Sequence, residues 1–290
     1  MIVKSLINRF LFKYIREHWN IAIADMGADL TPVNIKWMKH PYTDRWFADP
    51  FFIDEDKDHY VILVEEFLRD TGLGRLARLI VEKEHCKLVS NKTILDTPTH
   101  LSFPIPIKVD GETYIYPENA ASGATPYYQC AEKLKVKGLL SPLPLADPVI
   151  YKSDDCYYLF ATLPERCNGN VLNVYKSNNV FGSYELSQEI AFNDNVARRA
   201  GQVFVWKGKL ISPAQICNNH YGEGVCLQEL TIKDGLVSLD EIKRIFPTWH
   251  DEYNHAFHTY NVMDGKIVMD GNKINWSSVS KLYKKVRKIE

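Results

Sequence analysis

The sequence lacks the features that mark several common protein classes. Its 35 Lys and Arg residues nearly balance its 36 Asp and Glu residues, giving a formal net charge of -1 at pH 7. No overall field therefore favours nucleic acid or an anionic membrane. No apolar run is long enough to span a bilayer. The six Cys residues are dispersed, with neither C-x-x-C nor zinc spacing, which favours reduced thiols in the cytoplasm.

Signals for export and for dinucleotide binding are also missing. Lys4, Arg9, Lys13 and Arg16 interrupt the apolar N-terminus, unlike the continuous apolar core of a secretory signal. The segment "GLGRLARL" at residues 72–79 lacks the strand–GxGxxG–helix context of a dinucleotide fingerprint. The sequence therefore predicts a chain that stays inside the cell and uses no cofactor.

Helical periodicity is scarce and is concentrated at the N-terminus. Apolar residues at positions 2, 3, 6, 7, 10, 11, 14 and 15 form a stripe with a basic opposite face. This pattern predicts a short amphipathic helix over residues 1–18 that packs against the rest of the molecule; contact with a membrane surface is the alternative. Residues 19–290 contain no linker or low-complexity stretch, so they are expected to form one domain.

What the chain does contain is a repeated strand–turn–strand pattern. The segment "WFADPFFIDEDKDHYVILVEE" (46–66) has two apolar runs around an acidic turn, and similar segments begin at residues 101, 145, 199 and 258. Repeats of about 50 residues with this content are typical of propeller blades. The sequence thus predicts an all-β, five-bladed β-propeller. Residues 19–26 look like a further strand that closes the ring.

Acidic residues recur at equivalent places in the repeats. Asp49 and Asp147 precede the proline of two copies, while Glu65/Glu66 and Glu118 end the strands that follow. Innermost strands line the axis of a propeller, so Asp49, Glu66, Glu118 and Asp147 are predicted to face one central pocket as catalytic residues. Crowded carboxyls raise each other's pKa values, which suits glycosidic acid–base chemistry. The alternative is that Asp-Pro forms a turn that holds a blade in place.

Other polar residues project from equivalent positions. Arg198 and Arg199 precede the inner strand of the fourth copy, where an arginine suits a phosphate or carboxylate; solvated arginines on a surface loop are the alternative. His255 and His258 have the spacing of a metal pair, but no carboxylate or Cys follows at metal-site spacing, so no metal is predicted. The predicted substrate-binding residues are Trp46, Arg198, Arg199, Gln215, His258 and Asn261.

Six segments in order resemble one β-propeller family, and they include "RWFADPFF", "HLSFPIPIKVDGETYIYPEN" and "HAFHTYN". That family forms the N-terminal region of plant glucosamine inositolphosphorylceramide transferases and occurs in bacteria near surface-polysaccharide genes. The resemblance runs from Trp19 to about Gly271. More distantly, the pattern is similar to the arabinanase/levansucrase-like five-bladed glycosidases.

The resemblance implies a sugar-handling fold. It places the first acid of the glycosidases at Asp49 and the Asp that tunes their general acid at Asp147. In those enzymes the general acid is a Glu later in the chain, but the fourth copy here offers Gln202 and Gln215. The acid role would then fall to Glu118 or Asp147.

The function predicted from the sequence is carbohydrate-active. Glycosyl transfer in the assembly of a cell-surface polysaccharide or glycolipid is favoured, in the cytoplasm or at the inner face of the membrane. The expected partners are a sugar or sugar nucleotide and an enzyme of polysaccharide assembly, with no nucleic acid. Glycoside hydrolysis, and glycan binding beside a separate transferase, are the alternatives.

Overall fold

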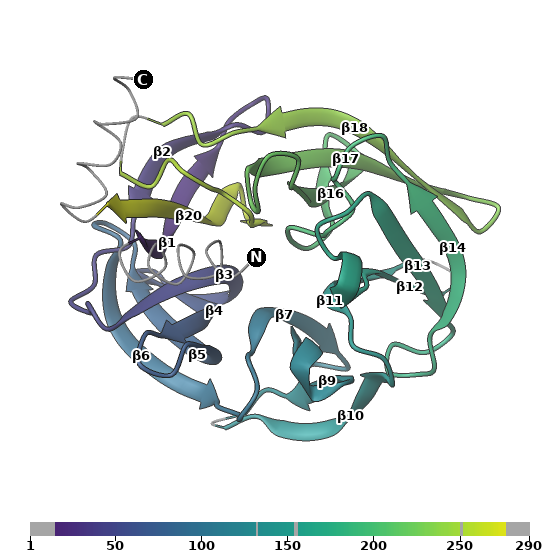
Figure 1. The fold of residues 1–290 in the computed structure, drawn as a ribbon, viewed down its shortest axis with the longest axis horizontal. Coiled ribbons are helices and arrows are strands. Elements are labelled where there is room, and N and C mark those ends of the chain that lie inside the picture. The colour runs from purple at the N-terminus through teal and green to yellow at the C-terminus, as the bar shows by residue number, and fades with distance from the viewer. Residues whose placement is uncertain (1–14, 132, 154–155, 250–251, 277–290) are drawn as a thin grey trace, which may run out of the picture.

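The computed structural model describes residues 15–131, 133–153, 156–249 and 252–276, which form a five-bladed β-propeller. Five four-stranded sheets surround a central axis (Figure 1). The predicted fold class is therefore confirmed. Of the helix predicted over residues 1–18, residues 1–14 lie outside the described residues. Residues 15–18 begin strand β1 (Ile15–Met26), so for these four residues the helix prediction is wrong.

The blades follow one another along the chain, and each is an antiparallel sheet. The first contains β3 (Arg45–Glu55), β4 (His59–Leu68), β5 (Leu73–Glu82) and β6 (Lys87–Leu95). The second contains β7 (Ser102–Val109), β8 (Glu112–Glu118), β9 (Thr125–Gln129) and β10 (Lys135–Ser141). The third contains β11 (Ala146–Lys152), β12 (Tyr157–Thr162), β13 (Val171–Ser177) and β14 (Glu185–Ala191).

The last two blades complete the ring. The fourth contains β15 (Phe204–Trp206), β16 (Lys209–Ile216), β17 (Gly224–Lys233) and β18 (Leu236–Ile245). The fifth contains β19 (Tyr260–Met263), β20 (Lys266–Trp276), β1 and β2 (Pro32–Trp37), in that order. Two short 3₁₀ helices, η1 (Ala120–Ser122) and η2 (Pro164–Arg166), lie in connections between strands.

The fifth blade is built from both ends of the described chain. Strand β1 pairs with β20 from Ile15↔Trp276 to Asp25↔Lys266. This pairing confirms the prediction that residues 19–26 form a strand that closes the ring. Because backbone hydrogen bonds tie the first strand to the last, detaching either one would leave a row of unpaired backbone groups.

The first three blades begin with the same backbone irregularity. Asp49, Phe103 and Asp147 have positive φ values of 49°, 46° and 43°. The register between the inner strand and its neighbour also shifts at each of these places. A bulge of this kind redirects a side chain away from the regular alternation of the strand. Asp adopts this backbone conformation more readily than Phe does, and the equivalence of the three positions is visible in the backbone itself.

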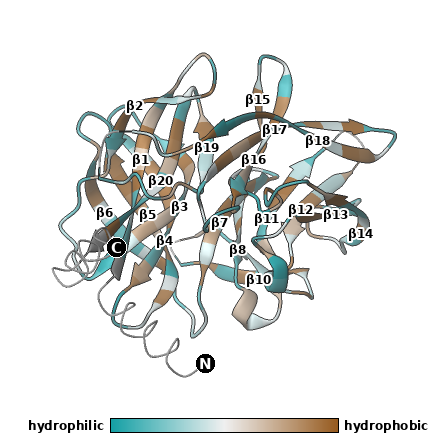
Figure 2. Cartoon of the chain, turned by 45° about the horizontal axis from the view of Figure 1, so that its top comes forward, coloured by the Kyte–Doolittle hydropathy of each residue, from teal (hydrophilic) through white to brown (hydrophobic). Residues whose placement is uncertain are grey.

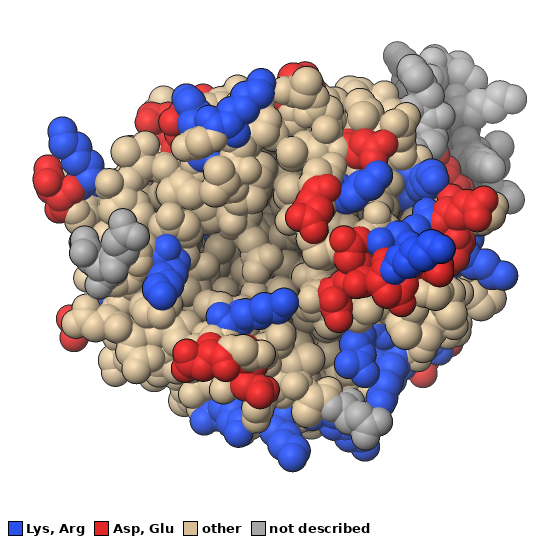
Figure 3. Space-filling model, turned by 180° about the vertical axis from the view of Figure 1, so that it is seen from behind, with Lys and Arg blue, Asp and Glu red and all other residues tan. Residues whose placement is uncertain are grey.

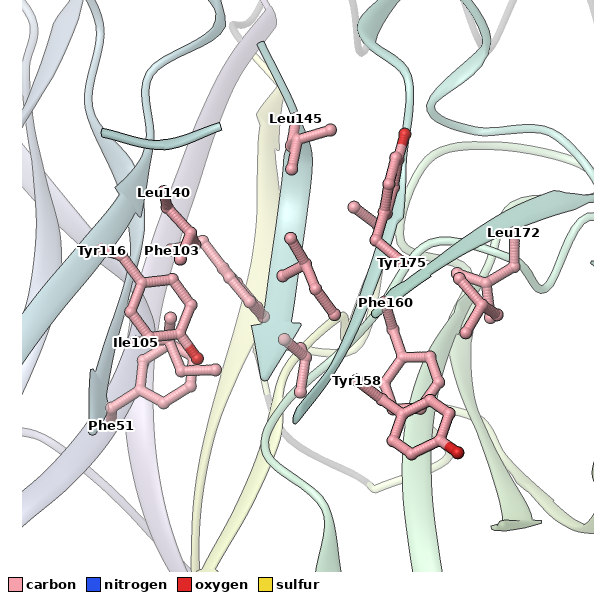
Figure 4. Packing of buried hydrophobic residues seen from close by; sticks show 14 of the residues in the cluster. Phe51, Phe103, Ile105, Tyr116, Leu140, Leu145, Tyr158, Phe160, Leu172 and Tyr175 are labelled. Carbon is pink, nitrogen blue, oxygen red and sulfur yellow. The ribbon is translucent and has the colours of Figure 1, made fainter. Parts of the chain in front are cut away.

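The largest hydrophobic cluster contains residues of the first four blades. Figure 4 shows part of it, including Phe51 and Phe103, whose rings meet edge to face with centroids 4.9 Å apart. Tyr116 is also fully buried, and its hydroxyl accepts a hydrogen bond from the Ile150 amide at 3.1 Å. Apolar and polar residues are interspersed along the strands (Figure 2). Each fully buried large apolar side chain contributes about 1.5–3 kcal/mol to folding, so this packing stabilises the ring.

The cysteines and the charged surface residues are arranged as the sequence composition indicates. All six cysteines are free, as their spacing predicts. Within the described ranges no helix is long and apolar enough to cross a membrane. On the side opposite to the view of Figure 1, Lys and Arg are interspersed with Asp and Glu around a hollowed centre (Figure 3).

Candidate functional site

The first group of site residues is a chain of carboxylate, imidazole and carboxylate. His258 lies just before β19, and its Nδ1 atom is 2.7 Å from Asp270 Oδ2. Its Nε2 atom is 3.3 Å from Asp49 Oδ1. Burial lowers the pKa of His258, but the charges of Asp270 and Asp49 outweigh it, and the net pKa is raised. The two carboxylates therefore favour the charged form of the imidazole between them.

The same contacts set the ionisation of the two acids. Burial raises the pKa of Asp49 to about 6, while the charge of His258 opposes the rise. The pKa of Asp270 is lowered because His258 more than offsets the effect of burial. Asp49 Oδ2 also accepts the Phe103 amide at 3.0 Å, which fixes this carboxyl between the first two blades. Near neutral pH, Asp49 is therefore mostly ionised although it is buried.

The second group surrounds Asp147 at the start of the third blade. Arg198 Nε donates to Asp147 Oδ2 at 2.5 Å, and Arg198 Nη2 donates to Glu118 Oε2 at 3.1 Å. Gln215 Nε2 donates to the same Asp147 oxygen at 2.6 Å. Burial raises the pKa of Asp147 to about 7 despite Arg198. The charge of Asp147 also raises the pKa of Asp49, so both groups belong to one site, which we call the central funnel.

Glu65 is a funnel residue that the predicted set of catalytic acids does not include. It is 4% exposed, and burial together with the charges of Asp49 and Glu118 raises its pKa well above the usual value. The Gly74 amide donates to His100 Nδ1 at 2.9 Å, which leaves the ring proton on Nε2, 3.3 Å from Glu65 Oε1. Burial and the neighbouring acids thus favour the protonated form of Glu65, beside Asp49.

Glu66 does not face the funnel as predicted. Neighbouring residues of a strand point to opposite faces, so Glu65 and Glu66 cannot both reach the axis. Glu66 Oε1 lies 2.8 Å from Arg45 Nη1, and its Oε2 atom lies 2.7 Å from Arg75 Nε. These bonds, with one from Asn91, lower the pKa of Glu66 although burial opposes them. Glu66 thus holds the first blade together, and the expectation that it lies in the pocket is wrong.

The two adjacent arginines also separate. Arg198 enters the funnel, whereas Arg199 is 0% exposed and points into the fourth blade. Its guanidinium donates to the carbonyl oxygens of residues 196 and 197, to Ser212 Oγ and to Gln228 Oε1. The prediction that Arg199 contacts substrate is therefore contradicted by its position, since all of these donors are directed into the protein interior.

Asn261 is also engaged within the protein. Its Nδ2 atom donates to the Pro50 carbonyl at 2.8 Å, and its Oδ1 atom accepts the Gln202 amide at 2.9 Å. Asn261 therefore links the fifth blade to the first and fourth. Both polar atoms of its side-chain amide are hydrogen-bonded within the protein, so this geometry does not support the predicted contact with substrate.

Aromatic rings flank the acidic groups. Trp19 packs on His258 with ring centroids 4.3 Å apart, and Tyr221 lies 5.2 Å from the same imidazole. Trp46 stacks on Phe67 at 4.4 Å and packs against the cluster that contains Trp19. Trp46 therefore packs near Trp19, and its contact with substrate stays a prediction. Trp19 is an aromatic residue that sequence reasoning assigned only to the closing strand.

One group of buried side chains in the funnel could also hold a cation. Asp49, His258 and Asp270 present ligand atoms that all lie within 4.8 Å of one another. Oxygen and imidazole donors in this combination suit a divalent ion. In the described contacts the imidazole instead bridges the two carboxylates.

Stability is expected to fall as the pH rises through the acids of the funnel. The pKa values of Asp49 (about 6) and Asp147 (about 7) lie above the ordinary 3.8. At these two acids the folded protein therefore binds more protons than the unfolded chain between about pH 4 and about pH 7, and their contribution to the free energy of unfolding decreases across that window. Asp147→Asn should make the decrease shallower. Urea unfolding of both proteins across this range measures it, and equal slopes would contradict a raised pKa at Asp147.

The fold and the site together define a class: a five-bladed β-propeller with buried acids at its axis. Residues 30–271 match the family model described as "Glucosamine inositolphosphorylceramide transferase 1, N-terminal". The chain belongs to this family. The resemblance inferred from its motifs is thereby confirmed.

Similar curated proteins carry the same name. Glucosamine inositolphosphorylceramide transferase 1 of Oryza sativa subsp. japonica is 27% identical over 257 residues, which cover 80% of this chain and 34% of the relative. The protein of that name in Arabidopsis thaliana is 22% identical over 201 residues, covering 62% of this chain and 26% of the relative. The chain thus spans about a third or less of these relatives.

Solved structures of similar shape are glycoside hydrolases. A GH43 β-1,3-galactosidase superposes with a TM-score of 0.57 at 14% identity, covering 73% of this chain and 52% of the other. A GH43 β-xylosidase/α-arabinofuranosidase from a compost microbial metagenome gives 0.56 at 11% identity, covering 81% and 92%. At these identities the likeness establishes the fold alone.

Proposed function

We propose that this propeller binds a sugar in the central funnel and carries out glycosyl transfer there. The observation that carries the proposal is a pair of buried, interacting carboxyl groups at the axis, Glu65 and Asp49, of which burial and neighbouring charges raise the pKa of Glu65 well above its usual value. Two carboxyl groups whose environments separate their protonation states are the usual basis for acid–base chemistry at a glycosidic bond. The aromatic rings of Trp19, Tyr221 and Trp46 offer flat surfaces for the apolar faces of a sugar.

The two acids have complementary roles in this proposal. Asp49 accepts the proton of an acceptor hydroxyl, whose oxygen forms the new bond to the anomeric carbon. The bond from that carbon to the leaving oxygen breaks, and Glu65 gives its proton to the leaving oxygen. Asp49 then returns a proton to Glu65, so the site is restored without any other reagent. His258 and Asp270 keep Asp49 charged before the reaction.

The second group supports the substrate rather than the proton transfer. Arg198 is shared between Asp147 and Glu118, and one face of its guanidinium lies 5.1 Å from the Tyr221 ring. This fixed cation offers donors to sugar hydroxyls or to a negative group on the substrate. Removing Arg198 would leave two carboxyls crowded together, which would raise their pKa values further.

Glycoside hydrolysis is the enzymatic alternative, and the names of the solved neighbours favour it. The resemblance to five-bladed glycosidases implies a general acid in the later part of the chain. There the structure has Gln215, whose amide donates to Asp147 and to the Arg199 carbonyl. An amide has no acidic proton to give, so hydrolysis by that arrangement is disfavoured.

Glycan binding without chemistry is the second alternative. In that case the funnel would present a sugar to a separate transferase of glycolipid or polysaccharide assembly. A cytoplasmic location, where sugar nucleotides are made, is part of the present proposal.

Incubation with a panel of sugar nucleotides and candidate acceptors separates the three functions. Transfer predicts binding and a new glycoside; hydrolysis predicts reducing sugar without an acceptor; a binding module predicts neither product. Glu65→Gln removes the transferable proton, so we expect product formation to fall about a hundredfold or more while binding persists.

The neighbouring Glu66→Gln is the matched control. It weakens the pairs with Arg45 and Arg75 and should lower stability, but activity per folded molecule should stay close to that of the unsubstituted protein. Equal activity in Glu65→Gln would contradict the assignment of Glu65 as the proton donor.

A further inference from the structure

A second pocket lies on the other face of the strands that carry the funnel. In the pairing of β1 with β20, Trp19 is opposite Asn272 and His18 is opposite Lys273. Side chains alternate between the faces of a sheet, so Trp19 faces the funnel while His18 and Lys273 line a separate pocket of about 700 Å³. We call this the lateral pocket. Its other walls include the end of β2, residues 38–43 and Arg69 of the first blade.

Positive charge predominates in the described lining of the lateral pocket. Lys39, Arg69 and Lys273 are cationic, and the carboxylate in this lining is Glu252, 2.7 Å from Lys273 Nζ. Arg69 Nη2 donates to His18 Nδ1 at 3.0 Å, so this ring nitrogen carries no proton. Burial, Lys273 and Arg69 lower the pKa of His18 to about 4. The imidazole is thus neutral and lies in a positive field.

A row of flat rings lines the same pocket. Trp37 and Tyr253 have ring centroids 4.5 Å apart, and Tyr253 lies 6.1 Å from His18. The row continues from His18 to His40 at 6.1 Å and from His40 to Tyr42 at 6.0 Å. Rings next to cations suit a ligand that has both a ring to pack and a negative group to neutralise.

We propose that the lateral pocket binds a phosphorylated ring compound, with its phosphate between Arg69 and Lys273 and its ring against Tyr253. A phosphate monoester carries up to two negative charges, which balances the excess of cations over Glu252. The guanidinium of Arg69 matches the geometry of phosphate oxygens. The pocket volume lies within the usual range for small-molecule sites.

The phosphate ester has two possible sources with the same chemistry. One is the phosphorylated head group of a lipid, and the other is a soluble sugar phosphate. Because the pocket occupies the opposite face of β1 and β20 from the funnel, binding there does not depend on the reaction proposed for Asp49 and Glu65. Asp49→Asn should therefore leave it unchanged.

Binding to the intact chain can be followed by tryptophan fluorescence, since Trp37 lines the pocket. We expect glucosyl phosphate to bind at least tenfold more tightly than methyl glucoside or inorganic phosphate, and to bind more weakly as salt is added. Sedimentation with phosphatidylcholine vesicles, with and without phosphatidylinositol 4-phosphate, whose ring carries a phosphate monoester, tests the lipid source. Binding to either phosphate ester supports the proposal and identifies its source; binding to neither overturns it.

Substitutions in the lateral pocket test which residues bind the phosphate ester. Arg69→Gln and Lys273→Gln should each weaken phosphate-ester binding at least tenfold. Lys39→Gln removes a third positive charge from the pocket and should also weaken binding; because Lys39 is exposed, this substitution should not disturb folding. The matched control is Lys209→Gln, whose ammonium also pairs with a carboxylate, Glu229, at 2.7 Å but in another blade. Unchanged affinity in the three pocket variants, or equal binding of methyl glucoside, would overturn the proposal.

Discussion

Asp49→Asn is expected to reduce sugar transfer by about a hundredfold or more, with little change in thermal stability. Asn has nearly the shape of Asp and also adopts a positive φ readily, so the backbone at residue 49 can be kept. The amide oxygen can still accept the Phe103 amide. What disappears is the negative charge that receives the acceptor proton and balances His258.

The measurement is the rate of product formation, compared with the melting temperature of the same sample. If sugar binding falls and no reaction is seen in either protein, the funnel is a binding module. Asp147→Asn should act in the same direction, since Arg198 and Gln215 both donate to that carboxyl. Full activity in Asp49→Asn would show that the Asp-Pro motif serves the architecture of the blade alone.

Arg199→Met is expected to lower the free energy of unfolding by about 3 kcal/mol or more. The substitution removes the donors that satisfy Ser212, Gln228 and two backbone carbonyls in a fully buried region. Each buried acceptor left without a donor costs about 1–3 kcal/mol, and methionine restores only part of the lost packing.

Chemical denaturation of Arg199→Met and the unsubstituted protein tests this expectation. The control is Arg244→Met: Arg244 is an arginine of the same blade, and its partners Asp194 and Glu241 are partly exposed. Exposed ion pairs contribute about 1 kcal/mol or less, so this variant should remain close to the unsubstituted protein. Similar losses in the two variants would mean that water satisfies the buried acceptors around residue 199.

The sequence predicted more of the fold than of the site. The apolar runs between turns, and the spacing of these runs, were sufficient to predict five blades. Each blade is a local unit, because its strands follow one another in the chain. The ring-closing strand from residue 19 was also predicted. The register of β1 against β20 was not, since it depends on contacts between the two ends of the chain.

Asp270 shows why part of the site could not be predicted. It is the Asp of an Asp-Gly pair that reads as a turn, yet the structure places it inside β20, 2.7 Å from His258. The only signal in the sequence was an Asp within an apolar run, which is unfavourable in a strand. Trp19 was likewise recognisable as part of a strand but not as a neighbour of His258.

The sequence by itself determined that the first and third repeats begin with equivalent acids, because Asp49 and Asp147 each precede a proline at the same place in the repeat, where the backbone bulge also recurs. Only the tertiary structure decided between Glu65 and Glu66, and between Arg198 and Arg199. Adjacent residues of an extended chain point in opposite directions, and composition cannot say which of the two faces the axis. That choice depends on strand register and on the packing of neighbouring blades, which assigns one member of each pair to the funnel and the other to the interior of a blade.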